Sequence, residues 1–143
     1  MVISSLIFWI LAAICNSIMD KTNHHYSKSI FVKLNPMWWN GEISWKNKYV
    51  NGDSTLGFRK LFPNSKGLLG KINYPVQLTD AWHFFKTLMI IFLVLSVIMF
   101  NSSSLTSFKN YLFVFVMYGM IWNVMFSLFY DKILVNRGNQ QKI

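Results

Sequence analysis

Uncharged, mostly apolar residues are gathered into three long runs along the chain. Residues 1–19, 87–108 and 110–130 contain no aspartate, glutamate, lysine or arginine. Each run is about 20 residues long, and a helix that rises about 1.5 Å per residue then crosses a hydrocarbon core about 30 Å thick. A soluble protein of 143 residues would have too few other residues to cover three such helices. The pattern therefore predicts an all-α membrane protein with three transmembrane helices.

The polar residues between the runs set the expected bounds within a single membrane domain, residues 1–143. Its parts are a first helix at about 2–19, a loop at about 35–78, a second helix at about 80–100, a link at 101–110, a third helix at about 111–130 and a tail at 131–143. The first helix can extend to about residue 34, because Asn35 and Pro36 are the first residues that end it. Thr79 is the expected N-cap of the second helix, and the short link should make the second and third helices an antiparallel hairpin.

Lysine and arginine are distributed unevenly among the segments that connect the runs. Ten of the 14 lie between Asp20 and Lys86, three follow Tyr130, and Lys109 alone lies in the link. Because cytoplasmic segments carry an excess of these residues, we expect the N-terminus outside and both the long loop and the C-terminus in the cytoplasm. The first run has no basic residue ahead of it, unlike a secretory signal, and is expected to remain in the mature chain as a helix.

The basic loop also carries tryptophans, and the two features together predict its partners. The net charge of +9 lies almost wholly on the cytoplasmic side, where an anionic lipid surface is the natural partner. No nucleic-acid recognition motif accompanies the charge, so nucleic acid is not expected to bind. Tryptophan prefers the headgroup level, so Trp38, Trp39 and Trp45 are expected as interfacial anchors. A small soluble core against the helix ends is the alternative for this loop. A membrane protein partner or a second copy of the chain is also expected.

Acidic residues and histidines fall at the predicted cytoplasmic ends of the helices. A histidine follows Asp20 and another follows Asp80 at a spacing of four or three residues, so each pair shares one helix face. We expect His24 or His25 to lie close enough to His83 or Asp80 for one ion or one water to bridge them. The whole layer consists of six groups: Asp20, His24, His25, Asp80, His83 and Asp131.

Polar residues also recur inside the predicted helices. Asn16 lies one turn before Asp20, and Asn123 and Ser127 lie four residues apart in the third run. An amide that faced lipid would leave its polar groups unpaired in hydrocarbon, so this intramembrane polar stripe should point into the bundle. The plainer interpretation is that these residues serve only the packing of the helices against one another.

The chemistry available to this set of residues leaves three functions open. Carboxylate and imidazole ligands suit zinc, iron or manganese, so a divalent metal ion is the cofactor that the layer could hold. The chain lacks the HExxH, GxSxG and phosphate-loop motifs, and its one cysteine, Cys15, lies in the first apolar run. Nothing therefore identifies an enzyme, and a non-catalytic accessory or scaffold subunit that binds the anionic cytoplasmic leaflet and a membrane partner is the leading expectation. One alternative is a metal-dependent or acid/base membrane enzyme that acts on a lipid headgroup. A second alternative is a transporter or an oligomeric pore.

Overall fold

The computed structural model describes residues 2–100, 105 and 107–136. Its long helices are α1 (Val2–His24), α4 (Ala81–Met99) and α5 (Phe108–Ser127), and one π-helical turn, η9 (Leu128–Ile133), follows α5. These helices are long and apolar enough to cross a membrane, over Ile3–His24, Ala81–Met99 and Phe108–Ile133. No β-strand occurs among the described residues. The all-helical fold class and the three apolar helices predicted from the sequence are therefore confirmed.

The first helix ends earlier than the sequence allows. It stops at His24, and short 3₁₀ turns replace the extension to about residue 34. Ser29 explains the change, because its hydroxyl accepts the Phe31 backbone N–H at 3.2 Å and donates to the Tyr26 carbonyl at 2.7 Å. A serine that bonds the nearby backbone in this way favours a turn over a helix.

The start of α4 differs from the prediction by one residue. Asp80, and not Thr79, caps the helix, since its Oδ1 accepts the backbone N–H of His83 at 2.9 Å. The Thr79 hydroxyl instead lies 2.7 Å from the Val76 carbonyl and closes the turn before the helix. A carboxylate at the N-cap also interacts favourably with the positive end of the helix dipole.

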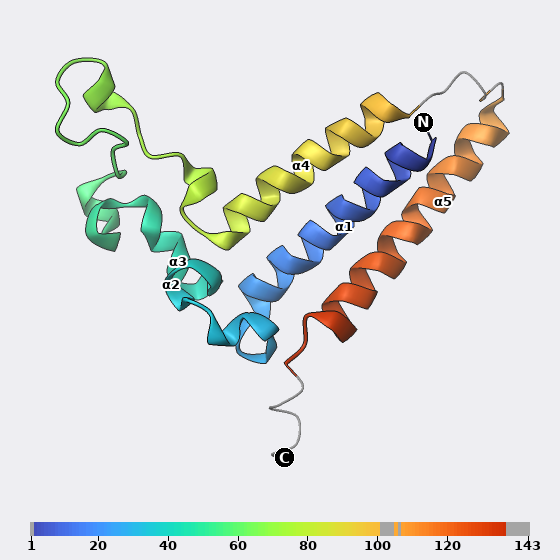
Figure 1. The fold of residues 1–143 in the computed structure, drawn as a ribbon, viewed down its shortest axis with the longest axis horizontal. Coiled ribbons are helices and arrows are strands. Elements are labelled where there is room, and N and C mark those ends of the chain that lie inside the picture. The colour runs from blue at the N-terminus through green and yellow to red at the C-terminus, as the bar shows by residue number, and fades with distance from the viewer. Residues whose placement is uncertain (1, 101–104, 106, 137–143) are drawn as a thin grey trace, which may run out of the picture. The chain divides into compact units, whose positions relative to one another are not determined.

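The chain divides into two units, Met1–Asp20 with Phe85–Val135 and Lys21–Phe84 with Asn136–Ile143. In the first unit α1 lies between α4 and α5 (Figure 1). Ala12 and Ala13 of α1 are fully buried, and such small side chains let membrane helices approach one another closely. Large apolar side chains of α5 point outward instead, with Phe115 77 % exposed, which gives this helix a surface suited to lipid.

Aromatic side chains join the helices of the first unit. The rings of Phe8 in α1 and Phe92 in α4 stack with their centroids 6.1 Å apart. On the other side of α1, the Trp9 indole N–H donates to the Tyr118 carbonyl of α5 at 2.9 Å, and the Trp122 ring lies 5.4 Å away. The predicted link at 101–110 and the end of the tail lie largely outside the described residues, so the hairpin stays a prediction.

The second unit is built from short helical turns. Asn35, Asn40 and Asp53 each begin one of them, because their side-chain oxygens accept the backbone N–H two residues further on. The turns are η1 (Tyr26–Lys28), η2 (Ile30–Lys33), α2 (Pro36–Trp39), α3 (Gly41–Ser44), η3 (Trp45–Lys48), η4 (Val50–Gly52), η5 (Ser54–Leu56), η6 (Leu69–Lys71) and η7 (Val76–Leu78).

A small aromatic core holds the second unit together. Phe31 is buried and stacks on Trp39 with ring centroids 4.4 Å apart, and the Trp38 ring packs edge-on against Trp39 at 4.9 Å. The backbone at Gly41 approaches Asn23 so closely that an added Cβ would lie 2.6 Å from the Asn23 amide oxygen. Glycine is required there because any other side chain would collide with this neighbour.

Candidate functional site

Asp80 and His83 form a hydrogen-bonded pair at the start of α4. Oδ2 of Asp80 lies 2.7 Å from Nδ1 of His83 and 3.0 Å from the Thr79 hydroxyl. The Asp80 side chain is 2 % exposed and the His83 side chain 25 % exposed, so the carboxylate is buried behind the imidazole. The three-residue spacing from the N-cap to the third helical residue brings these groups together, as in other capping arrangements.

The pair determines the tautomer of the His83 ring. A carboxylate oxygen accepts hydrogen bonds, so Nδ1 of His83 donates to Asp80 and carries the proton in the neutral ring. Nε2 is then the nitrogen that accepts a hydrogen bond or a proton. Such an arrangement can orient an imidazole for acid/base work or for holding a polar ligand.

A pocket of about 210 Å³ opens beside this pair within the second unit. The described residues that line it include no lysine or arginine. The Trp82 ring stands at 83° to the His83 ring, with centroids 5.0 Å apart, and so forms part of an aromatic wall. The lining residues are Asn23, Gly41, Ser44, Trp45, Asp80, Trp82 and His83.

Four of these residues were not expected from the sequence: Asn23, Gly41, Ser44 and Trp82. Ser44 is buried, and Asn23 is placed in the pocket by the close approach of Gly41. No sequence motif marks Asn23 or Ser44, because their proximity to Asp80 depends on packing between turns far apart along the chain. The position of Trp82 in the pocket could have been inferred from the sequence, since this residue lies between Asp80 and His83.

The other two histidines lie outside this pocket's lining. His24 and His25 are exposed, and His24 borders a second hollow of about 170 Å³, where its Nε2 lies 3.3 Å from Nδ2 of Asn23. Asn23 therefore borders both hollows. Among the described residues, no three histidine, cysteine, aspartate or glutamate side chains are placed together to hold a metal ion. The bridge from His24 or His25 to the Asp80 pair stays a prediction.

The remaining predicted polar residues belong to the first unit. Asp20 and Asp131 both lie close enough to Tyr130 to act on it electrostatically. Asn16 is half-buried in α1. Asn123 and Ser127 are exposed on α5, and the inward orientation expected of this polar stripe stays a prediction. The Asn123 amide donates to the Gly119 carbonyl of its own helix at 2.9 Å, a bond that uses one of its two N–H groups.

The predicted interfacial tryptophans have different surroundings. Trp38 and Trp39 are half-buried in the aromatic core, and Trp38 lies 5.9 Å from the ring of Phe84 in the first turn of α4. Trp45 is 42 % exposed, and Nζ of Lys46 lies 5.8 Å from the centre of its ring. Trp45 is therefore the tryptophan of the three that is best placed to contact an outside surface.

Residues 54–79, here called the basic apolar segment, combine exposed apolar side chains with positive charge. The segment contains no acidic residue. Its Arg59 guanidinium lies 4.6 Å from the centre of the Tyr74 ring. Its exposed large apolar residues are Leu56, Phe58, Leu61, Phe62, Leu68, Leu69, Ile72 and Leu78. Its basic residues are Arg59, Lys60, Lys66 and Lys71.

The turn that leads into this segment is stabilised by Asp53. The Thr55 hydroxyl and backbone N–H both donate to its Oδ1, at 2.7 and 2.8 Å. These hydrogen bonds to the charged form hold the pKa of the Asp53 carboxyl below its usual range. The carboxylate therefore serves the turn locally.

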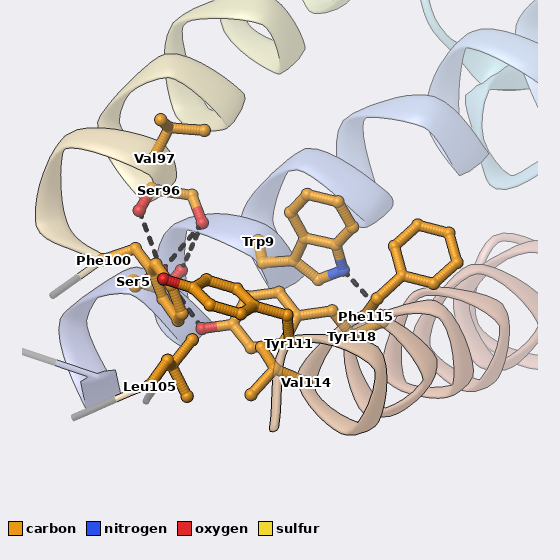
Figure 2. Close-up of a pocket in the computed structure, with 10 residues that line it drawn as sticks. All are labelled: Ser5, Trp9, Ser96, Val97, Phe100, Leu105, Tyr111, Val114, Phe115 and Tyr118. Atoms are coloured by element: carbon orange, nitrogen blue, oxygen red, sulfur yellow. Dashed lines mark hydrogen bonds between the residues drawn. The ribbon is translucent and has the colours of Figure 1, made fainter. Parts of the chain in front are cut away.

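The first unit contains a hydroxyl network beside an apolar pocket of about 240 Å³ (Figure 2). Ser5 Oγ lies 2.8 Å from the Ser96 carbonyl, and Ser96 Oγ lies 2.9 Å from the Ser5 carbonyl, so the two serines bond α1 and α4 reciprocally. The Tyr118 hydroxyl of α5 donates to Ser5 Oγ at 3.1 Å. This network satisfies the buried polar atoms and joins all three helices.

The fold defines a helical protein with three helices apolar enough to span a membrane and a second, tryptophan-rich unit of short turns. No protein-family model, curated protein or solved structure matches the chain.

Proposed function

We propose that the protein is an integral membrane accessory or scaffold subunit. Its three apolar helices cross the bilayer with the N-terminus outside, and its second unit lies on the anionic cytoplasmic leaflet. The positive-inside rule supports this orientation, because ten of the 14 lysines and arginines lie between Asp20 and Lys86.

The basic apolar segment is the observation that carries the proposal. A water-facing surface rarely exposes so many large apolar side chains in one short stretch, and Leu68 alone is 80 % exposed. Transfer of such side chains into the interface is favourable at about 25 cal/mol for each Å² of apolar area removed from water. Each lysine or arginine near an anionic surface adds up to about 1 kcal/mol. Both contributions favour lipid over water around this segment.

The outer surface of α5 supports a partner within the membrane. Its side chains are large and apolar, and α1 and α4 leave much of this surface exposed. The exposed Asn123 and Ser127 add hydrogen-bonding groups that another membrane helix could bond. A partner protein or a second copy of the chain would bind on this face.

One observation favours a second candidate function. The buried Asp80 orients His83 beside a pocket, and this is the arrangement of an acid/base pair. In this alternative the protein is a membrane enzyme that acts on a lipid headgroup.

A spin label at position 68 tests the leading proposal. The protein carries Cys15→Ala and Leu68→Cys and is placed in lipid nanodiscs with or without phosphatidylglycerol. We expect the label to be accessible to oxygen and shielded from a water-soluble nickel chelate in the anionic discs. The pair Lys60→Gln and Lys66→Gln should reduce the shielding more than the charge-matched pair Lys28→Gln and Lys33→Gln. A label that is equally accessible to the chelate in both kinds of disc would contradict the proposal.

A further inference from the structure

We infer that the pocket beside Asp80 and His83 binds the primary ammonium group of a lipid headgroup, as in phosphatidylethanolamine. The inference rests on the proposed membrane location of the second unit and names the ligand of the site. Trp82 and His83 belong to the first turn of α4, one of the helices long enough to cross the bilayer. A pocket at the end of such a helix lies at the depth of the lipid headgroups.

The charge inside the pocket selects a cation. Asp80 contributes a buried carboxylate, and no lysine or arginine occurs among the described residues that line the pocket. The rest of the unit is strongly basic, so this pocket differs in sign from its surroundings. A positively charged group of modest size is therefore attracted to this pocket.

The hydrogen-bonding groups select an ammonium that carries N–H bonds. Nε2 of His83 accepts in the neutral ring because Nδ1 donates to Asp80. Asn23 and Ser44 also line the pocket and have oxygen atoms that can accept. The trimethylammonium group of phosphatidylcholine has no N–H to donate, so it cannot make these bonds.

The aromatic residues complete the recognition of the headgroup. Trp45 and Trp82 both line the pocket, and the faces of indole rings attract cations. Lys46 lies over the Trp45 ring, with Nζ 5.8 Å from its centre. It is placed to bind the phosphate of a headgroup whose ammonium enters the pocket.

The test uses full-length protein in detergent, labelled with 5-fluorotryptophan, with the Trp82 signal assigned through Trp82→Phe. Dihexanoyl phosphatidylethanolamine should shift the fluorine signal of Trp82 saturably, and dihexanoyl phosphatidylcholine should not. Asp80→Asn keeps an N-capping side chain and should weaken binding by roughly tenfold or more. Asp53→Asn removes a carboxylate from the same unit outside the pocket and should leave the affinity unchanged.

Three results would overturn the inference. Equal shifts of the Trp82 signal with the two lipids would exclude recognition of a primary ammonium. This comparison uses the wild-type protein alone. An unchanged affinity in Asp80→Asn would exclude the carboxylate as its partner. Binding of free ethanolamine as tightly as the lipid would contradict a lipid source.

The inference and the proposed function fail separately. Loss of ethanolamine selectivity with the position-68 label still shielded by anionic lipid would overturn the inference alone. A water-exposed label with ethanolamine selectivity intact would overturn the proposed location of the basic apolar segment.

Discussion

Replacing Ser5 and Ser96 by alanine should weaken the association of α1 with α4. Two hydrogen bonds cross between these helices, from each serine hydroxyl to the other serine's carbonyl, at 2.8 and 2.9 Å. Interhelical hydrogen bonds in membrane proteins contribute about 0.6 kcal/mol on average and up to about 1.7 kcal/mol. Each single variant should therefore lower the free energy of unfolding by roughly 0.5–1.5 kcal/mol. The Ser5 variant should lose more, because Tyr118 also donates to its hydroxyl.

A double-mutant cycle separates this contact from a general effect of removing hydroxyl groups. We expect a coupling energy of about 0.6 kcal/mol or more between Ser5→Ala and Ser96→Ala, since their hydroxyls also lie 3.1 Å apart. Ser17→Ala is the matched control, because Ser17 is equally buried in α1 but its hydroxyl donates to the Ile14 carbonyl of the same helix.

The assay is reversible unfolding in mixed micelles by increasing dodecyl sulfate, followed through tryptophan fluorescence and circular dichroism. Ser17→Ala combined with Ser96→Ala should show no coupling beyond the error of the cycle. Coupling of equal size in both cycles, or none in the first, would refute the contact between the two hydroxyls. Single-variant losses no larger than that of Ser17→Ala would refute the interhelical hydrogen bonds to the carbonyls.

Two further predictions concern the second unit. Gly41→Ala should destabilise the second unit by about 1–3 kcal/mol, because the new Cβ would lie 2.6 Å from the Asn23 amide oxygen. Gly119→Ala in α5 of the first unit, where a Cβ meets nothing within 4 Å, is the control and should cause no such loss. Equal melting curves by circular dichroism would contradict this. Because the folded pKa of Asp53 is depressed, its contribution to the turn is present above the unfolded pKa and lost as pH falls through the folded pKa. The Thr55 amide resonance should move in that acidic range in the wild type, and an identical acid response in Asp53→Asn would exclude the carboxylate as its cause.

The sequence predicts the long helices well because each is defined by a continuous run of uncharged residues. Three charge-free runs are sufficient to define α1, α4 and α5, and the start of α4 was placed within one residue from Thr79 and Asp80. The end of α1 was not predictable in the same way, because no glycine or proline marks it. The turn at Ser29 depends on which backbone groups its hydroxyl reaches.

The candidate site was predicted only where its residues are close in sequence. Asp80 and His83 share a helix turn, so their spacing was sufficient to pair them. The contributions of Asn23 and Ser44 depend on how Gly41 packs, which no periodic pattern records. The hydrogen bond from the Asn123 amide to its own helix was also not predictable, because the spacing of polar residues is the same whether they bond within their helix or to another one.

Membrane topology tests the central claim most directly. A reporter that is active only outside the cytoplasm is inserted at one of three positions. These are within residues 102–104, near Ser65 in the basic apolar segment, and after Ile143. We predict activity for the first insertion alone, because the basic residues place the other two positions in the cytoplasm. Activity at Ser65 and Ile143 with none at 102–104 would contradict the account, since the second unit and its pocket would then face the opposite leaflet.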